Sequence, residues 1–296
     1  MPTPAFLQHL KDGKILVSDG ATGTNLQQRG LPVGLPGEVW VFEKPEEILG
    51  LHRDFIAAGS DILLTCTFGG TSLRLESHGL GQRTAELNRA AVSLARQAAQ
   101  GSGALVAGSI GPTGQLLKPL GPLEESQAEA AFAEQARALV EAGVDLIVVE
   151  TQFDLTEASA ALRAVRSVSA EIPLVCSFSF DRGKRTMMGV KPSQVAETLP
   201  ALGAQVLGIN CGRSLDENLE ALRQLRAATD LPLWFKPNAG LPEVDAEGNP
   251  IYRLSPAEMG AQAALWLQAG AQVVGGCCGT SPAHLQAVAQ AVHPAA

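Results

Sequence analysis

Eight short apolar runs recur along the chain, and each predicts a β-strand. The runs are almost continuously hydrophobic and lack the strict alternation of a strand with one face in water. This pattern is typical of strands that are buried on both faces, as in a parallel sheet covered by helices. The runs begin near Lys14, Asp61, Ala104, Asp145, Pro173, Ala204, Pro232 and Ala271.

A stretch with helical periodicity follows each apolar run. Ser193, Ser255 and Ser281 stand where helix N-caps are expected, and glycines follow the helical stretches in EAGVD, ALGAQ and QAGAQ. Eight such units predict a (β/α)8 barrel over residues 1–296, forming one domain. An open doubly wound sheet is the alternative, although it usually has fewer units. The predicted helices cover residues 46–58, 83–100, 124–142, 156–168, 193–202, 215–228, 255–269 and 282–292.

Charge and hydropathy narrow the range of partners. The chain has 22 Lys and Arg against 30 Asp and Glu, a net charge of −8, which disfavours nucleic acid and anionic membranes as partners. The longest apolar runs have fewer than ten residues, whereas a membrane span needs ~20. The start, MPTPAFLQHLKDGK, lacks the features of an export signal, so we expect a cytoplasmic protein.

The cysteines are the most informative residues. Cys211 follows the sixth predicted strand, and the adjacent Cys277 and Cys278 follow the eighth. Active sites of these barrels lie at the C-terminal ends of the strands, so the three thiols are expected to converge there. Three thiolates suit Zn²⁺ with an open fourth position, as in a catalytic site. The alternative is that these cysteines are small buried hydrophobic residues.

Two further cysteines and the histidines are left out of this metal site. Cys176 lies inside the fifth strand and is expected in the core, whereas Cys66 ends the second strand and could face the mouth. The histidines fall in helices or their flanks, where we expect solvated or half-buried side chains. They are His9, His52, His78, His284 and His293.

Zn²⁺ held by three thiolates has a net charge of −1, which favours activation of a substrate thiol over polarisation of a carbonyl. Asp19 and Glu150 follow the first and fourth strands and could bind an ammonium group. The SDGATGT loop offers N–H groups for a carboxylate. Alternatively, Asp19 caps a turn and Glu150 pairs with an arginine. Lys236, after the seventh strand, could form a Schiff base in a lyase, reach a carboxylate or extend along the barrel wall with its ammonium group in water.

The ordered motifs DGATGT, SIGPTG, ETQFD, GINCG, KPNAGLP and GGCCGTSPAH resemble the homocysteine S-methyltransferase family. The similarity is strongest to the homocysteine-binding modules of cobalamin-dependent methionine synthases, which are zinc-containing (β/α)8 barrels. It implies that Cys211, Cys277 and Cys278 bind zinc. It also implies that Asp19, Glu150 and the backbone of Gly20, Ala21 and Thr22 hold homocysteine, and that Asn238 fills the open zinc position without substrate. Thr22 and Cys66 depart from the usual motifs.

The methyl donor is left open by the sequence. A corrinoid-binding DxHxxG motif is absent. A separate corrinoid protein could therefore present a methyl group from methylcobalamin or methyltetrahydrofolate, or a small donor such as S-methylmethionine, S-adenosylmethionine or betaine could enter directly. The chain could also be an excised module, a subunit that only presents the thiol to such a partner, or a methyltransferase for another thiol. A betaine cage would draw on Trp40, Phe68, Phe153 and Tyr252.

Overall fold

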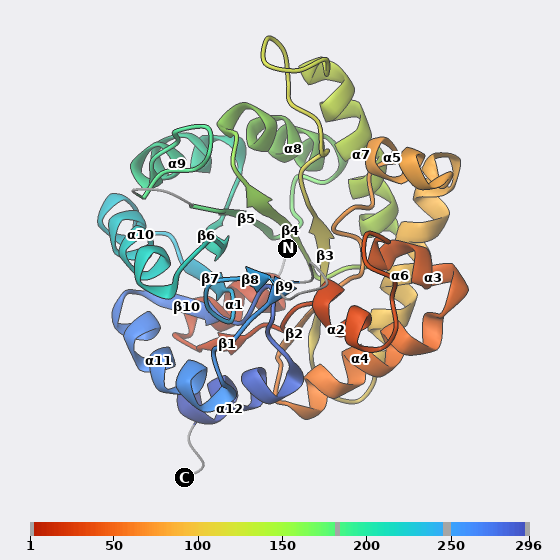
Figure 1. Cartoon of the computed structure of the whole chain (residues 1–296). Coiled ribbons are helices and arrows are strands. Elements are labelled where there is room, and N and C mark those ends of the chain that lie inside the picture. Colours follow the sequence, from red (N-terminus) through yellow and green to blue (C-terminus); the bar gives the residue numbers. More distant parts are fainter. Residues whose placement is uncertain (1–2, 181–183, 245–249, 294–296) are drawn as a thin grey trace.

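The computed structural model describes residues 3–180, 184–244 and 250–293. Eight parallel strands form one sheet, in the order β1-β10-β7-β6-β5-β4-β3-β2, and helices surround it (Figure 1). All eight predicted strands are therefore confirmed. They are β1 (Leu16–Val17), β2 (Ile62–Leu64), β3 (Leu105–Ile110), β4 (Leu146–Gln152), β5 (Leu174–Phe178), β6 (Val206–Cys211), β7 (Leu233–Pro237) and β10 (Ala271–Val274).

The first and second strands close the sheet into a barrel. Ser18 and Ile62 form a parallel bridge, and the Asp19 N–H donates to the Ile62 carbonyl at 2.9 Å. On the other side of this bridge the Asp61 N–H donates to the Val17 carbonyl at 2.7 Å. The closure confirms the (β/α)8 barrel and removes the open-sheet alternative.

The eight predicted helices are present with boundaries close to those expected. Ser255 and Ser281 are N-caps as predicted, but the prediction for Ser193 was wrong, because the helix begins at Pro192 with Lys191 as its N-cap. Proline favours the first helical position, which places the cap before it. These helices are α4 (Pro45–Ala57), α6 (Thr84–Ala99), α7 (Glu125–Glu141), α8 (Leu155–Val168), α9 (Pro192–Thr198), α10 (Leu215–Ala228), α11 (Pro256–Gln268) and α12 (Pro282–Val292).

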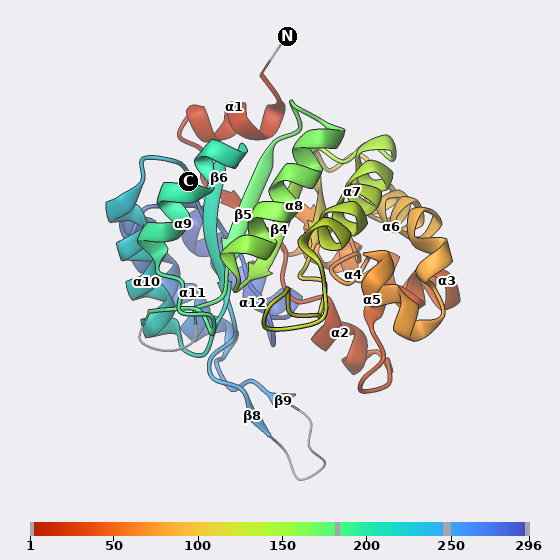
Figure 2. The ribbon, with the colours of Figure 1, turned by 90° about the horizontal axis from the view of Figure 1, so that it is seen from above.

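Several short elements were not predicted. Helix α1 (Ala5–Lys11) lies across the N-terminal end of the barrel, where Phe6 and Leu10 join the apolar cluster inside it (Figure 2). The hairpin of β8 (Glu243–Val244) and β9 (Pro250–Ile251) projects from the opposite end (Figure 2). The other short helices, α2 (Gly23–Gln28), α3 (Trp40–Glu43) and α5 (Ser72–Leu75), lie in loops after β1 and β2. Within the described ranges, no helix combines the length and apolar character of a membrane span.

The inner face of the barrel changes from apolar to polar along the strands. Leu146 and Val148 of β4, and Trp234 of β7, belong to the apolar interior cluster. Side chains alternate along a strand, so Glu150 and Lys236 occupy the next inward positions, at the C-terminal ends. The barrel therefore carries an apolar core with a polar layer at its mouth.

Candidate active site

The three predicted metal-binding cysteines come together at the mouth of the barrel. Their sulfur atoms all lie within 4.8 Å of one another, and the three side chains are partly exposed. Among the described residues, they form the one cluster of at least three His, Cys, Asp or Glu side chains that could hold a metal ion. The convergence of the three thiols that the sequence predicts is therefore observed.

The backbone at Cys211 is in a conformation that favours glycine. Its φ is 62°, in the left-handed region, and the following Gly212 has a φ of 78°. The Asn218 side chain donates to the Cys211 carbonyl at 2.6 Å and helps to hold this turn. Strained residues of this kind persist where the surroundings fix them, often at functional sites. Here the turn directs the Cys211 thiol toward the other two.

The loop that carries Cys277 and Cys278 is tied to β7. The Cys277 N–H donates to the Pro237 carbonyl at 2.8 Å, and the Ala239 N–H donates to the Cys278 carbonyl at 2.9 Å. Thr280 donates its hydroxyl to the Cys277 carbonyl at 2.7 Å. Backbone contacts on both sides therefore position the two adjacent thiols.

The chemistry of the three thiols fits a divalent cation. A hydrogen bond with Cys277 lowers the pKa of Cys211, but Cys278 and burial outweigh it and raise that pKa to about 12. A hydrogen bond with Cys211 likewise lowers the pKa of Cys278, but Cys277 and burial raise it to about 12. The pKa of Cys277 is also raised, chiefly by its hydrogen bond with Cys211 and by burial. Crowded thiols resist ionisation, and a bound cation removes this cost.

Asn238 provides a second sign of fit. Its side-chain nitrogen donates to the Gly212 carbonyl at 2.7 Å, in the turn beside Cys211. Its side-chain oxygen is buried and has no hydrogen-bond partner among the described residues. An unpaired buried carbonyl oxygen is costly, and a cation would satisfy it.

A cavity of about 710 Å³ opens above the thiols. Gly20, Ala21, Thr22 and Glu150, all predicted to bind substrate, line this cavity together with the three cysteines. Asp19 is only 1% exposed and does not line it, and Asn238 is likewise buried behind the lining residues. The predicted substrate contacts thus divide into residues that face the cavity and residues that support its wall.

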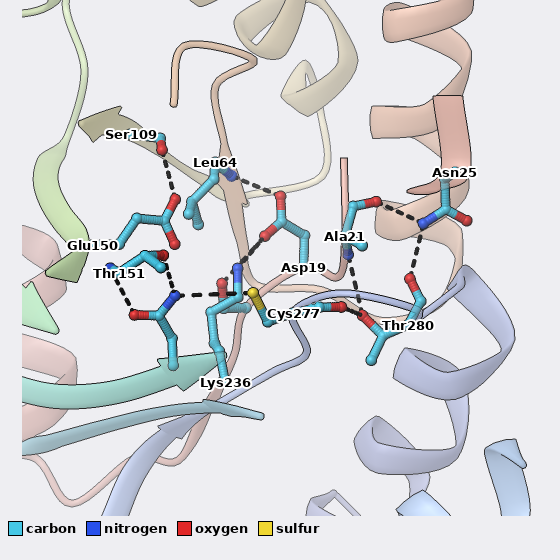
Figure 3. Close-up of polar contacts among 12 residues, drawn as sticks. Asp19, Ala21, Asn25, Leu64, Ser109, Glu150, Thr151, Lys236, Cys277 and Thr280 are labelled. Atoms are coloured by element: carbon cyan, nitrogen blue, oxygen red, sulfur yellow. Dashed lines mark hydrogen bonds and ion pairs between the residues drawn. The ribbon is translucent and has the colours of Figure 1, made fainter. Parts of the chain in front are cut away.

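A buried charged network supports that wall (Figure 3). The Lys236 ammonium group donates to Asp19 Oδ1 at 2.8 Å, and the Leu64 N–H donates to Asp19 Oδ2 at 2.7 Å. Glu150 accepts from the Ser109 hydroxyl at 2.5 Å. Burial raises the pKa of Glu150, whereas Lys236 and Ser109 act to lower it. Lys236 therefore reaches a carboxylate, which was one of the three alternatives for this residue.

The SDGATGT loop is held to the loop after β10. The Ala21 N–H donates to the Thr280 hydroxyl at 3.1 Å, so this N–H group is already engaged by the protein. Asn25 donates to the carbonyls of Ala21 and Thr280, at 2.6 and 2.8 Å. These bonds join the first and last mouth loops of the barrel (Figure 3).

Other sequence expectations have mixed outcomes. Cys176 is buried in the core as predicted. Cys66 is also buried, but it lines the cavity. The expectation of solvated or half-buried histidines was wrong for His52 and His284, which are buried. Trp40 is also buried, in α3, and does not line the cavity, so it is not available for an aromatic cage.

Glu38 is a cavity residue that the sequence interpretation missed. It is 5% exposed, lines the cavity and accepts a hydrogen bond from the Gly69 N–H. Burial raises its pKa. The available signal was a lone glutamate in the apolar stretch LPGEVW, which periodicity alone does not distinguish from a solvated residue.

A family model described as homocysteine S-methyltransferase matches residues 16–292. The chain belongs to this family. Over 295 aligned residues it is 33% identical to a methionine synthase of Mycobacterium tuberculosis, covering 94% of this chain and 25% of that protein. A methionine synthase of Mycobacterium leprae is 32% identical, with 94% and 24% covered. The chain thus spans about a quarter of the length of these curated relatives.

A solved structure of this family matches over nearly the whole chain. The homocysteine methyltransferase MmuM from Escherichia coli, in its metallated form, superposes with a TM-score of 0.80 at 28% sequence identity. The match covers 96% of this chain and 98% of that one. Membership of a methyltransferase family and the barrel geometry therefore agree with each other.

Proposed function

We propose that this protein is a zinc-dependent homocysteine S-methyltransferase that forms methionine. The observation that carries the proposal is the convergence of three cysteine sulfurs, within 4.8 Å of one another, at the floor of a cavity in a barrel of this family. Zn²⁺ bound by Cys211, Cys277 and Cys278 would lower the pKa of an incoming thiol and hold it as a thiolate. A cytoplasmic location, which we also propose, would keep the three thiols reduced.

The surrounding residues would bind and orient the amino-acid end of homocysteine. Glu150 lines the cavity and would accept hydrogen bonds from the ammonium group, with Asp19 as a charged partner in the wall. The carboxylate would lie against the backbone of Gly20, Ala21 and Thr22. Because Ala21 already donates to Thr280, the neighbouring N–H groups of the loop would make that contact.

The transfer step moves one methyl group. A lone pair on the homocysteine thiolate forms the new S–C bond while the bond between methyl carbon and donor breaks, and that electron pair leaves with the donor. The product is a neutral thioether, a weaker metal ligand than a thiolate. Asn238, whose side-chain oxygen has no hydrogen-bond partner in the described part of the chain, would occupy the open metal position when substrate is absent.

A second candidate function is a module that presents homocysteine to a separate corrinoid protein. Its support is a set of exposed apolar side chains around the mouth. Six large hydrophobic side chains are exposed among the described residues, and five lie in loops on the mouth side. These five are Val33, Leu116, Leu120, Met187 and Leu241. Methionine formation from a free small donor would favour the independent enzyme, and methionine formation only with a methylcorrinoid protein would favour the module.

The metal assignment is tested by cysteine substitution. We expect Cys211→Ser, Cys277→Ser and Cys278→Ser each to lose zinc, as measured by mass spectrometry of protein purified without added metal. Cys66→Ser is the matched control, because Cys66 lines the same cavity outside the cluster and should leave zinc content unchanged. Full zinc occupancy in all three cluster variants would contradict the assignment of these cysteines as zinc ligands.

Substrate binding is tested on the wild-type protein. Zinc K-edge absorption should report about three sulfur ligands without substrate and about four after homocysteine is added. Assays with S-methylmethionine, S-adenosylmethionine, betaine and a methylcorrinoid protein then identify the donor. A zinc site that does not respond to homocysteine would contradict the proposed activation of this thiol.

A further inference from the structure

Glu38 is a buried carboxylate at the mouth of the barrel that has no part in homocysteine binding as proposed above. It lies in a one-turn helix, Gly37–Val39, after β1, is 5% exposed and lines the cavity. One of its oxygens accepts a hydrogen bond from the Gly69 N–H, in the loop after β2. The other accepts no hydrogen bond from another residue in the described ranges. One carboxylate oxygen is therefore available to a ligand in the cavity.

No cation of the described residues pairs with Glu38. Arg74 and His78 act on it only through space. Arg74 instead donates to the Pro112 carbonyl at 3.3 Å and lies over the Phe68 ring, 5.5 Å from its centre. Burial raises the pKa of Glu38, and its backbone hydrogen bond and the two cations only partly oppose this. A buried carboxylate without a cation is costly, so a positively charged ligand would stabilise it.

Glu38 and Cys211 line the same cavity from opposite sides of the mouth. In the closed ring, β6, which ends at Cys211, is four strands away from β2 in either direction. The loop after β2 that contacts Glu38 therefore lies across the barrel from that thiol (Figure 1). A cavity of about 710 Å³ is large enough for a drug-sized ligand. It therefore has room for a second small molecule between the thiols and Glu38.

The wall around Glu38 is otherwise apolar. Phe68 already lies beneath Arg74, and Trp40 is buried outside the lining, so these two rings build no aromatic cage for a quaternary ammonium group. A carboxylate within a mainly aliphatic surface suits a small cation that carries methyl groups, such as a sulfonium. The apolar lining residues from the loops after β1 and β2 are Leu31, Leu35, Phe68 and Leu73.

We propose that Glu38 recognises the positive charge of the methyl donor, and that this donor is a small sulfonium compound. The inference rests on the proposed function and deepens it, because it names the class of the second substrate. During transfer the homocysteine thiolate forms the new S–C bond and the S–C bond of the sulfonium breaks. Its electron pair stays on the donor sulfur, which becomes a neutral thioether. Glu38 therefore binds a charge that the donor carries and its product lacks.

The first test isolates the positive charge. Dissociation constants are measured for S-methylmethionine and for 2-amino-5-methylhexanoate, in which a CH group replaces the sulfonium sulfur. Contacts of the shared amino-acid end cancel in the ratio of the two constants. We expect the wild type to prefer the sulfonium by at least about tenfold, and Glu38→Gln to lose this preference. The glutamine retains an oxygen for the Gly69 N–H, so zinc content and homocysteine affinity should not change.

Glu157→Gln is the matched control. Glu157 is a second buried carboxylate, 2% exposed, whose pKa is also raised by burial. It does not line the cavity, and it accepts hydrogen bonds from the Thr113 N–H and hydroxyl, both at 2.7 Å. Glutamine can accept the same two bonds. This variant should retain the wild-type preference for the sulfonium.

The second test uses steady-state rates at saturating homocysteine. Because the donor loses its charge on the way to the transition state, Glu38 stabilises the bound donor more than the transition state. Glu38→Gln should therefore raise the KM for S-methylmethionine by about tenfold, with kcat unchanged or increased and the KM for homocysteine unchanged. A merely structural role would not produce this division. A decrease in kcat with an unchanged KM for S-methylmethionine would overturn the proposal.

The remaining outcomes separate this inference from the proposed function. Equal dissociation constants for the two probes in the wild type, or an unaltered preference in Glu38→Gln, would overturn it. Methyl transfer from betaine or a methylcorrinoid protein but not from S-methylmethionine would overturn it as well. Should Glu38→Gln fail to fold by circular dichroism, Glu38→Met, which suits the apolar wall, takes its place. Failure of the proposed function itself would appear in the wild type, as absent zinc or absent homocysteine binding.

Discussion

Thr151 carries a backbone strain that its neighbours hold in place. It has a φ of 58°, a conformation that β-branched residues rarely adopt, and it follows directly on Glu150. The Thr151 N–H donates to Asn210 Oδ1 at 2.8 Å, and Asn210 Nδ2 donates to the Thr151 hydroxyl at 2.6 Å. The pairing of β4 with β5 shows a register shift between Val149 and Gln152. Asn210 thereby fixes the turn that aims Glu150 into the cavity.

Substitution Asn210→Ala should therefore destabilise the fold and weaken substrate binding together. It leaves the Thr151 N–H and the Ser177 hydroxyl without their buried acceptor, which costs about 2–4 kcal/mol. Urea denaturation measures the stability, and titration with homocysteine measures the affinity. Thr151→Ser keeps the hydroxyl and should leave both close to wild type. An Asn210→Ala variant unchanged in both measurements would contradict this role.

The convergence of the three cysteines could be predicted from their positions at strand ends, but the ion pair between Asp19 and Lys236 could not be predicted from the sequence. Cys211, Cys277 and Cys278 each follow an apolar run, so barrel geometry alone brings them to one mouth. Asp19 and Lys236 lie 217 residues apart. Their ion pair depends on the inward direction of both side chains, and the sequence left Asp19 as a substrate ligand or a turn cap. Three-dimensional register decides among these alternatives.

The hairpin and the cysteine loop depend on one glycine. Gly279 has a φ of 79°, and a Cβ placed there would lie 2.2 Å from Tyr252 Cγ. Tyr252 follows β9 and lines the cavity together with Cys278. The segment that follows the return strand of the hairpin therefore packs directly on the loop that carries two of the three thiols.

Substitution Gly279→Ala should push Tyr252 away and disturb Cys278, lowering zinc affinity by at least about tenfold, beyond the ~1 kcal/mol of backbone strain. Competition with a chelator measures the affinity. Tyr252 is the single tyrosine of the chain, so its ultraviolet absorbance reports its displacement. Gly143→Ala is the control, because Gly143 has a φ of 86° and open space around it. Equal zinc affinity in both variants would refute the coupling.

Elements with a repeated pattern were predicted well, and elements set by local packing were not. The predicted helix over residues 215–228 has the observed boundaries of α10, because Ser214 caps its start and the apolar face is regular. Helix α1 has seven residues, too few for a clear periodicity. Its role comes from Phe6 and Leu10, which fill the end of the barrel. Such a contact exists only once the barrel is closed.

Stability of the whole molecule should depend on a buried histidine. Both ring nitrogens of His52 are buried without a hydrogen-bond partner among the described residues. Burial lowers its pKa to about 4, partly opposed by Asp19. Between pH 6.5 and about 4 the unfolded chain binds a proton at His52 that the folded protein does not. The free energy of unfolding is therefore not reduced by His52 above pH 6.5, and it decreases as the pH falls from 6.5 toward 4.

Unfolding measured between pH 7 and 4 tests this expectation. The loss attributable to His52 is at most about 3 kcal/mol. His52→Phe should flatten the pH dependence relative to wild type, while His78→Phe, at an exposed histidine, should retain it. Glu38, Glu150 and Glu157 have raised pKa values with the opposite sign of effect, and they cancel in the difference between variants. Identical pH profiles for His52→Phe and wild type would rule out this contribution.

The bridge between Ser18 and Ile62 is the seam at which the barrel meets itself, and β1 contributes only two residues beside it. The Asp19 side chain connects the two sides of this seam, because its carboxylate accepts a hydrogen bond from the Leu64 N–H. Lys236 of β7 donates a second hydrogen bond to the same carboxylate. The bonds that close the barrel and the bonds that support the cavity wall are thus the same. The barrel cannot open between β1 and β2 without disrupting the cavity proposed to bind substrate. A ligand that stabilises these bonds would therefore also stabilise the closed barrel.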